Sequence, residues 1–225
     1  GDKPETFEKI MENIMLLLKY NINPDIRINL DKNNTNSFME LADIFKQKGL
    51  ENLHLYLGQV TANTIACSSN FGCLNTSEFS KISLEFNKML EAKGFSVPEY
   101  FYYPGARSNF CGGDQINSFV LDPEGYMYKC WNIIGEVEES IGNVKDLEKD
   151  IDDSTNSCSS RSIMNHAKWT TWSPLENETC SKCKLLPICM GGCPHVNLTN
   201  SSGTKCEKWK YVLENVIKYT YSRHV

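Results

Sequence analysis

The chain lacks any long hydrophobic run. Its longest apolar stretch is the segment from Ile14 to Leu18, whereas a membrane-spanning helix needs about 20 consecutive apolar residues. No signal peptide is visible at the N-terminus. With 23 basic against 28 acidic residues, the chain also has no excess of positive charge that would bind nucleic acid. We therefore expect a compact cytoplasmic protein that binds neither membranes nor nucleic acid.

Cysteine, by contrast, is abundant, because ten of the 225 residues are cysteines. Seven of them follow one spaced pattern: Cys111, then Gly125 and Cys130, then Cys180-x2-Cys183-x5-Cys189-x3-Cys193, then Cys206. Cytosolic cysteine-rich proteins bind metal more often than they form disulfides. The thiolates from Cys180 to Cys189 are close enough in sequence to share one iron–sulfur cluster or one zinc ion. Two metal centres fit the whole pattern best.

Other interpretations of the cysteines remain open. One is a secreted disulfide scaffold, suggested by the even number of cysteines and by the N-x-S/T sequons that begin at Asn75, Asn177, Asn197 and Asn200. Disulfide-dense domains are usually shorter than about 80 residues, however. Another is a four-thiolate zinc site at Cys180, Cys183, Cys189 and Cys206, which leaves three cysteines unexplained. The third is that the cysteines are merely buried thiols.

The first hundred residues alternate between helical and strand patterns. The expected elements are a helix capped by Thr6, a strand at Asp25–Leu30, a helix opened by a capping box at Ser37–Glu40 and ended by Gly49, a strand at Leu53–Leu57, a helix over residues 77–90 and an extended segment at Val97–Tyr103. Strands separated by helices indicate βα units and a parallel sheet.

The second half of the chain predicts a hairpin, a polar insertion and a closing helix. The turn Asp122–Gly125 has Pro at its second position and Gly at its fourth, and it would return the strand to place Cys130 beside Cys111. Residues 136–179 are polar and acidic, with a loop at 154–162 and with Trp169 and Trp172 as packing residues. The closing helix, 207–221, carries Trp209, Val212, Leu213, Val216 and Ile217 on one face.

The seven cysteines and Gly125 resemble the SPASM domain, a C-terminal extension of many radical S-adenosylmethionine (SAM) enzymes that modify peptides and proteins. The resemblance implies two auxiliary 4Fe-4S clusters with interleaved ligands. Cys180, Cys183, Cys189 and Cys206 would bind one cluster, and Cys111, Cys130 and Cys193 the other. Because neighbouring cysteines then serve different clusters, losing either cluster should loosen both lobes.

The resemblance also implies an α/β fold in two domains. Residues 1–104 resemble the second half of a partial (β/α)6 radical SAM barrel, and residues 105–225 a small α+β SPASM domain with a β-hairpin and cluster-binding loops. The family binds its reactive cluster with C-x3-C-x2-C, which is absent, since Val196 stands where the third cysteine would follow Cys193. We therefore expect a C-terminal fragment, with Gly1 as a scar of tag removal, that does not cleave SAM alone. SAM and a third 4Fe-4S cluster would belong to the full-length parent.

Three cysteines lie outside the pattern, and the cluster of Cys111, Cys130 and Cys193 lacks a fourth ligand. Cys67 or Cys73, both in the loop after the second strand, could supply it, and Cys73 is favoured because a helix anchors its loop. Alternatively, the site stays open for a substrate thiolate, as is thought for some relatives that form thioethers. Cys158 is expected to be an ordinary thiol.

Arg27 and Asn29 lie on the polar face of the first strand, which would look inward in a barrel. A charge buried there needs a partner. One hypothesis is that these two residues bind SAM. The alternative is a structural ion pair with a neighbouring strand.

Two departures narrow the subfamily. Anaerobic sulfatase maturases have a further cysteine six residues before the first one, where this chain has Gly105, and a catalytic Asp where this chain has Trp131. The chain is more similar to enzymes that mature ribosomally made peptides by forming thioether or other crosslinks or by epimerising residues. The implied partners are a peptide or protein substrate and an electron donor such as ferredoxin or flavodoxin.

In such a reaction the clusters would transfer electrons or anchor the substrate. No catalytic residue can be named from the sequence. The alternatives left open are sulfatase-maturase-like modification and a zinc-binding interaction module without radical chemistry.

Overall fold

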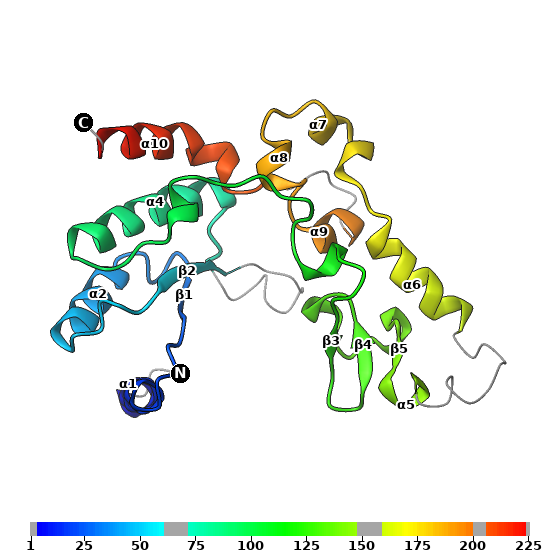
Figure 1. Ribbon diagram of the computed structural model, residues 1–225, viewed down its shortest axis with the longest axis horizontal. Coiled ribbons are helices and arrows are strands. Elements are labelled where there is room, and N and C mark those ends of the chain that lie inside the picture. Colours follow the sequence, from blue (N-terminus) through cyan, green and yellow to red (C-terminus); the bar gives the residue numbers. More distant parts are fainter. Residues whose placement is uncertain (1–3, 61–71, 148–158, 200–205, 224–225) are drawn as a thin grey trace. The chain divides into compact units, whose positions relative to one another are not determined.

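A computed structural model describes residues 4–60, 72–147, 159–199 and 206–223. The fold is mixed α/β with small sheets, which confirms the predicted class at that level (Figure 1). The chain divides into two compact units. Unit 1 comprises residues 1–103 and 211–225, and unit 2 comprises residues 104–210. None of the helices in the described ranges is both long and apolar enough to cross a bilayer.

Unit 1 contains a β–α–β arrangement, as the sequence predicts. Its elements in chain order are α1 (Pro4–Lys19), β1 (Ile26–Leu30), α2 (Phe38–Gln47), β2 (Leu55–Gln59), α4 (Thr76–Ala92), the 3-10 turn η1 (Glu99–Phe101) and most of α10 (Trp209–Ser222). β1 and β2 pair in parallel, with Ile26 opposite Leu55 and Leu30 opposite Gln59. The alternation of β1 places Leu30 in the core and leaves Arg27 exposed on the other face.

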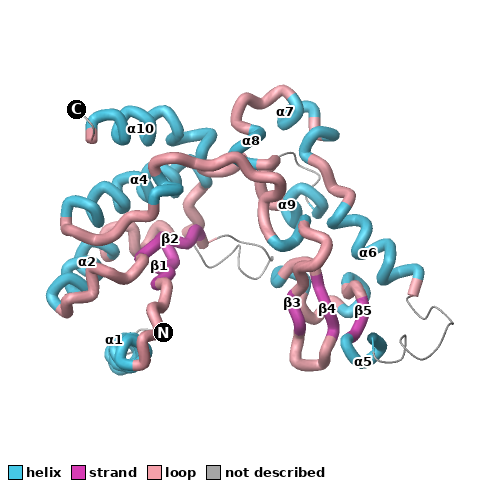
Figure 2. Tube along the Cα trace, in the orientation of Figure 1, coloured by secondary structure: helices cyan, strands magenta, loops and turns pink. Residues whose placement is uncertain are grey.

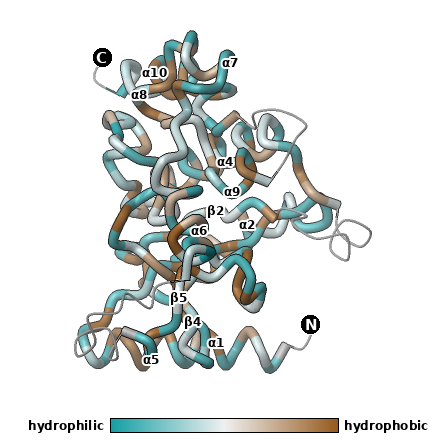
Figure 3. Tube along the Cα trace, turned by 90° about the vertical axis from the view of Figure 1, so that its right-hand side faces the viewer, coloured by the Kyte–Doolittle hydropathy of each residue, from teal (hydrophilic) through white to brown (hydrophobic). Residues whose placement is uncertain are grey.

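The main core cluster of unit 1 is apolar and lies on the buried face of this sheet. It draws on α1, α2, β1, β2 and α4. At its centre the Phe38 and Phe86 rings meet edge to face, with centroids 5.3 Å apart. Figure 3 shows hydrophobic and hydrophilic residues interspersed along α1, and this helix turns Met11 and Ile14 into the core. Periodic apolar residues are therefore what positions the helices on the sheet.

Three local predictions in unit 1 are wrong. The first helix begins at Pro4, two residues before Thr6. Ser37 has helical backbone angles, so its side chain makes no capping hydrogen bond and the capping box does not form. The segment at Val97–Tyr103 forms η1 instead of a strand, because the N–H groups of Phe101 and Tyr102 donate to carbonyls three residues earlier. Phe101 and Tyr102 are both buried, so burial does not alternate along this segment.

The closing helix is confirmed as α10, but its buried face is shifted. Val212 and Val216 are buried as predicted, whereas Ile217 is 56% exposed and Thr220 is buried. The helix is fastened to α4 by polar contacts. Glu91 accepts a hydrogen bond from Tyr219 and pairs with Arg223 at 2.5 Å. Burial raises the pKa of Tyr219 to about 12, so this hydroxyl remains a donor at neutral pH.

Unit 2 is mostly loops and short elements, as Figure 2 shows. They are η2 (Gly112–Asp114), β3 (Val120–Leu121), β4 (Tyr126–Tyr128), η3 (Trp131–Ile133), η4 (Val137–Glu139), β5 (Gly142–Asn143), α5 (Val144–Leu147), α6 (Ser160–Thr170), η5 (Pro174–Glu176), α7 (Glu178–Ser181), α8 (Leu186–Cys189) and α9 (Pro194–Thr199). An antiparallel sheet of order β3-β4-β5 contains the predicted hairpin.

The hairpin turn has the predicted chemistry. The N–H of Gly125 donates to the carbonyl of Asp122 at 3.1 Å, and Gly125 adopts a φ of +89° that favours glycine. Close to the sheet, Trp169 packs in a small core with Tyr128 and Ile133. This confirms Trp169 as a packing residue. In the predicted loop at 154–162, residues 154–158 lie outside the described residues, and α6 begins at Ser160.

Candidate metal centres

Cys180, Cys183, Cys189 and Cys206 line one pocket of about 480 Å³ in unit 2. Local hydrogen bonds hold the first of these cysteines in place. The side chain of Asn177 caps α7 by accepting the N–H groups of Thr179 at 3.0 Å and Cys180 at 3.1 Å. The N–H of Cys183 in turn donates to the carbonyl of Cys180 at 3.0 Å. Capping therefore positions Cys180 and, through it, Cys183.

The thiols of this pocket influence one another. Burial raises the pKa of Cys189, the N–H of Gly191 opposes the rise, and Cys183 and Cys180 raise the pKa further. These sulfurs therefore lie close enough to interact electrostatically. Since metals bind the thiolate, a metal centre here would have to displace the protons of these thiols.

A tight turn separates Cys189 from Cys193. Met190, Gly191 and Gly192 have φ values of 46°, 77° and 78°, and the N–H of Gly192 donates to the carbonyl of Cys189 at 3.0 Å. A Cβ atom at Gly191 would lie 2.5 Å from a side-chain atom of Pro174, so only glycine fits there. The chain turns sharply between Cys189 and Cys193, which explains why two cysteines only four residues apart can belong to different groups. Cys189 lines the four-cysteine pocket and Cys193 does not.

Cys193 lies instead near Cys111 and Cys130. Partial burial raises the pKa of Cys130, the N–H of Asn132 opposes the rise, and Cys193 and Cys111 raise the pKa further. Partial burial also raises the pKa of Cys111. The N–H of Gly113 opposes the rise, and the charges of Asp114 and Cys193 raise the pKa further. The three thiols thus form a second group within unit 2.

Asp114 and Gly113 shape the loop that carries Cys111. One oxygen of Asp114 accepts the N–H of Cys111 at 3.0 Å, and the other accepts the N–H of Phe110 at 2.7 Å. The N–H of Gly113 donates to the Cys111 sulfur at 3.3 Å. Such N–H to sulfur bonds favour the thiolate over the thiol.

Three residues that support these cysteines were not found from the sequence. Lys129 is 2% exposed, and its ammonium donates to the carbonyl of Ser118 at 2.8 Å and to that of Gln115. Asn197 donates to the carbonyls of Gly191 and Cys193, each at 3.0 Å. In the sequence, Asn177 and Asn197 stand out only as the first residues of N-x-S/T sequons. For Asn177, the N-cap preference of asparagine was a usable signal.

Among the residues that the structure describes, no three Cys, His, Asp or Glu side chains are placed to hold one metal ion. A zinc ion needs four sulfurs at about 2.3 Å from one point. A 4Fe-4S cluster instead takes each cysteine on a different iron, so its ligand sulfurs lie farther apart. A wide pocket with four cysteines in its lining therefore fits a cluster better than a single ion.

The other cysteines are placed as follows. Cys73 belongs to unit 1 and precedes α4, whose N-cap is Asn75. Cys67 and Cys158 lie outside the described residues. The cysteines in thiol form, without a disulfide, include Cys73, Cys111, Cys130, Cys183, Cys189, Cys193 and Cys206.

Arg27 and Asn29 are both exposed on the polar face of β1. Arg27 lies over Gly58 of β2, where an added Cβ would overlap the Arg27 Nε atom. The absent side chain of Gly58 therefore makes room for the guanidinium group. No ion pair joins Arg27 to a residue within the described ranges.

No family model and no curated protein matches the chain, but solved structures do. Native anSMEcpe, an anaerobic sulfatase-maturating enzyme with bound AdoMet and Cp18Cys peptide, aligns with a TM-score of 0.64 at 16% identity, over 96% of this chain and 63% of that protein. The chain has the fold of part of a radical SAM enzyme. Hexahistidine-tagged anSMEcpe with AdoMet aligns with a TM-score of 0.59 at 16% identity, over 96% of this chain and 60% of that protein.

The structural comparison confirms the predicted resemblance to radical SAM enzymes of the SPASM type at the level of the fold. The chain spans less than two thirds of the length of these neighbours. At 16% identity the likeness concerns the fold alone, and AdoMet and the peptide are ligands of those proteins.

Proposed function

We propose that this chain is the auxiliary cluster-bearing portion of a radical SAM enzyme that modifies a ribosomally made peptide. The observation that carries the proposal is the sorting of seven cysteines into two groups within unit 2. In this proposal residues 1–104 are the second half of the partial barrel and residues 105–225 are the SPASM domain. The parent enzyme would also hold SAM and a third cluster, and would use an electron donor such as ferredoxin or flavodoxin.

Each group of cysteines would hold one 4Fe-4S cluster. The four-cysteine pocket supplies a ligand for every iron, whereas Cys111, Cys130 and Cys193 leave one iron to a further ligand. A buried atom with no protein partner supports a bound group in this region: His195 Nδ1, two residues after Cys193, has no hydrogen-bond partner among the described residues. In the tautomer that is protonated at Nδ1, a bound cluster would offer sulfur acceptors to this nitrogen. When bound, the clusters supply one-electron redox chemistry or a Lewis-acid site for a substrate sulfur.

The fourth ligand of the second cluster would be Cys73, Cys67 or a substrate thiolate, and between the two cysteines we favour Cys73. If Cys73 is the ligand, Cys73→Ser should lower the cluster content of the anaerobically reconstituted chain. If the site is open, the variant keeps its clusters and an added cysteine-containing peptide perturbs their absorbance spectrum.

Arg27 and Asn29 are the proposed SAM-binding residues. Their exposure on one strand face and the room left by Gly58 support this role. In the full-length enzyme Arg27→Ala should weaken SAM binding. Normal SAM affinity with lowered stability would favour a structural role instead.

Sulfatase-maturase-like modification is the second candidate, and the fold likeness to anSMEcpe favours it. The sequence favours peptide maturation, because an indole at Trp131, 70% exposed, cannot accept a proton as a carboxylate would.

The test of the proposal is an iron and sulfide count on the anaerobically reconstituted chain. The wild type should be brown, with absorbance near 400 nm as expected from the family resemblance. Cys183→Ala and Cys111→Ala should each lose about one cluster of iron, and the double variant should lose both. Cys158→Ser is the matched control and should keep the full count. Colourless protein with stoichiometric zinc would instead favour the interaction module, and unchanged iron in both alanine variants would refute the ligand assignment.

A further inference from the structure

Charge is unevenly distributed along unit 2. Residues 104–178 contain 13 acidic and 6 basic residues, whereas residues 179–210 contain five lysines and one acidic residue, Glu207. The lysine-rich segment is the one that holds the four-cysteine pocket. In a chain of net charge −5, this local reversal of sign requires a physical explanation.

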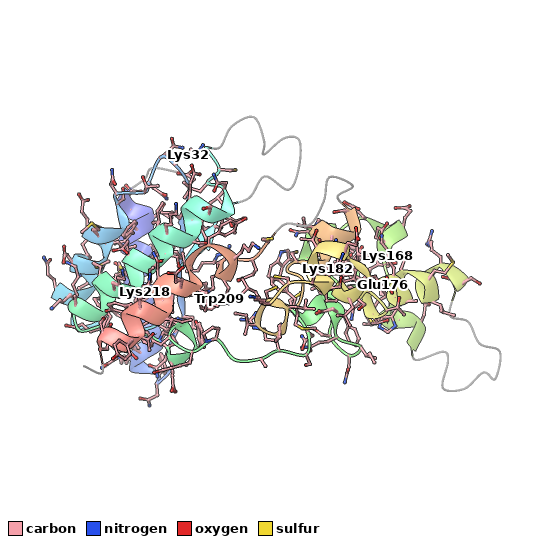
Figure 4. The ribbon with its side chains drawn as sticks, turned by 90° about the horizontal axis from the view of Figure 1, so that it is seen from above. Lys32, Lys168, Glu176, Lys182, Trp209 and Lys218 are labelled. Atoms are coloured by element: carbon pink, nitrogen blue, oxygen red, sulfur yellow. The ribbon has the colours of Figure 1, made fainter. Side chains whose placement is uncertain are left out.

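Three of these lysines stand at the pocket itself. Lys182, Lys184 and Lys210 are part of its lining, and all three are exposed. We call these three residues the lysine rim. Lys182, labelled in Figure 4, is 77% exposed and lies 3.3 Å from Glu178, one helical turn away. Exposed ion pairs of this kind are weak, so the rim remains available to an external partner.

A simple explanation is that the rim only offsets the negative charge of the thiolates in a bound cluster. Exposed ammonium groups are poorly suited to that task, because water and salt screen them from a buried charge. Charges at the surface act instead on an approaching protein, by steering its encounter. The exposure of the rim therefore favours a partner over internal compensation.

The chemistry of the rim also indicates the kind of partner. The part of the pocket lining that the structure describes contains no arginine, the side chain that recognises carboxylates with fixed bidentate geometry. Lysines are hydrated point charges on flexible stems, which suit brief, electrostatically steered contacts. The partly exposed Leu185 and Leu186 belong to the same lining as the lysines. A small apolar contact ringed by flexible charge is typical of weak electron-transfer complexes, which bury less than about 1,200 Å².

We propose that the lysine rim is a docking surface for a small acidic electron-carrier protein. This inference rests on the proposed function, since it requires a cluster in the four-cysteine pocket. The exchange is of one electron: a reduced carrier is oxidised by one electron and the cluster is reduced by one, or the reverse. No covalent bond forms or breaks, and no proton is transferred.

The test measures the association rate of an acidic flavodoxin with the anaerobically reconstituted chain at low and high ionic strength. Reversal of the rim charge by Lys182→Glu, Lys184→Glu and Lys210→Glu together should slow association about 10- to 100-fold at low salt and flatten its salt dependence. Lys48→Glu, Lys81→Glu and Lys218→Glu form the control, with the same change in net charge on exposed lysines of unit 1. Lys218 is matched to Lys182 because it also pairs with a glutamate four residues earlier.

Several results would overturn the proposal. They are an unchanged association rate, an equal slowing in the control, and binding of basic cytochrome c as fast as of flavodoxin. Equally strong, rim-dependent binding of poly-glutamate would show an acidic-peptide site instead. The variant with Lys182→Gln, Lys184→Gln and Lys210→Gln removes the rim charge without reversing it, which guards against an effect of misfolding. A shift in the reduction potential of the cluster without slower association would mean that the rim tunes the cluster instead of binding a partner.

Iron is counted in every sample. A wild-type chain that holds iron but does not bind flavodoxin refutes the docking surface alone. A wild-type chain without iron refutes the proposed function and the docking surface with it.

Discussion

The two units are held together by different means. The main cluster of unit 1 brings 15 buried apolar residues together around a parallel strand pair. In unit 2 a described cluster has three buried members, Tyr128, Ile133 and Trp169, and the seven patterned cysteines lie in loops and short helices. Each fully buried large apolar side chain contributes about 1.5–3 kcal/mol. Unit 1 can therefore be stable through packing, whereas the described residues of unit 2 supply far less of this stabilisation.

This difference indicates that the proposed clusters have a structural role in unit 2. Loops have little internal packing, and metal binding that requires a folded site adds its binding free energy to folding. The hydrogen bonds around Cys111 and Cys180 prepare the sites, but they are local and cannot order the whole unit. We expect the clusters to tie these loops together.

Removal of iron should have the largest effect. Treatment of the reconstituted chain with an iron chelator should abolish amide exchange protection around Cys111 and Cys180 in unit 2. Protection in β1, β2 and α4 should persist, since these elements rest on apolar packing. Hydrogen exchange with mass spectrometry measures both. Equal loss of protection in both units would mean that unit 1 also depends on the clusters.

Phe86→Ala is the converse experiment in unit 1. Phe86 has no exposed surface and contacts the Phe38 ring, so its truncation should cost about 3–5 kcal/mol. Denaturant unfolding of unit 1 should shift accordingly, while the iron content stays at the wild-type value. Ile217→Ala is the control, since this side chain is 56% exposed and should cost well under about 1 kcal/mol. Iron loss in Phe86→Ala would show that the two units are not independent.

Gly125→Ala in unit 2 and Gly94→Ala in unit 1 compare one glycine from each unit, both with the same backbone conformation. The φ angles are +89° and +90°, so both substitutions strain the backbone similarly, by about 1–3 kcal/mol. A Cβ at Gly125 would also lie 2.9 Å from Val144, whereas nothing lies within 4 Å of one at Gly94. Gly125→Ala should therefore be the more destabilising and should also lower iron content, because the turn leads to Cys130. Normal iron with equal destabilisation would make the hairpin irrelevant to the metal site.

Much of unit 1 could be predicted from sequence because its signals are periodic. The alternation from Ile26 to Leu30 and the apolar stripe of α4 identify a strand and a helix directly. Periodicity failed at η1, where consecutive buried aromatic residues looked like a strand. It also missed Thr220, whose burial is tolerated because its hydroxyl donates to the carbonyl of Val216 in the preceding turn.

The supporting residues of unit 2 were harder to predict. The cysteine spacing indicated which cysteines belong together, but not which side chains hold their loops. Lys129 looks like an ordinary surface lysine in the sequence, and only the fold brings the carbonyl of Ser118 within 2.8 Å. Contacts between loops depend on tertiary structure and have no periodic pattern.

The smallest expected effect compares two helix starts in unit 1. The sequence predicted a capping box at Ser37 and missed the one at Asn75. In the structure the Asn75 side chain accepts the N–H of Glu78 at 2.9 Å, and Glu78 accepts the N–H of Asn75 at 3.0 Å. Asn75→Ala should therefore lower the free energy of unfolding by about 1 kcal/mol.

Ser37→Ala should change the free energy of unfolding by only a few tenths of a kcal/mol, because Ser37 makes no capping bond. Urea unfolding of the two variants side by side measures the difference. The cap matters beyond stability, since Asn75 fixes the start of α4 two residues after Cys73. If Cys73 binds the second cluster, Asn75→Ala should also lower iron content, whereas an open site predicts a loss of stability with iron unchanged. Equal costs for the two variants would contradict the assignment of the cap to Asn75.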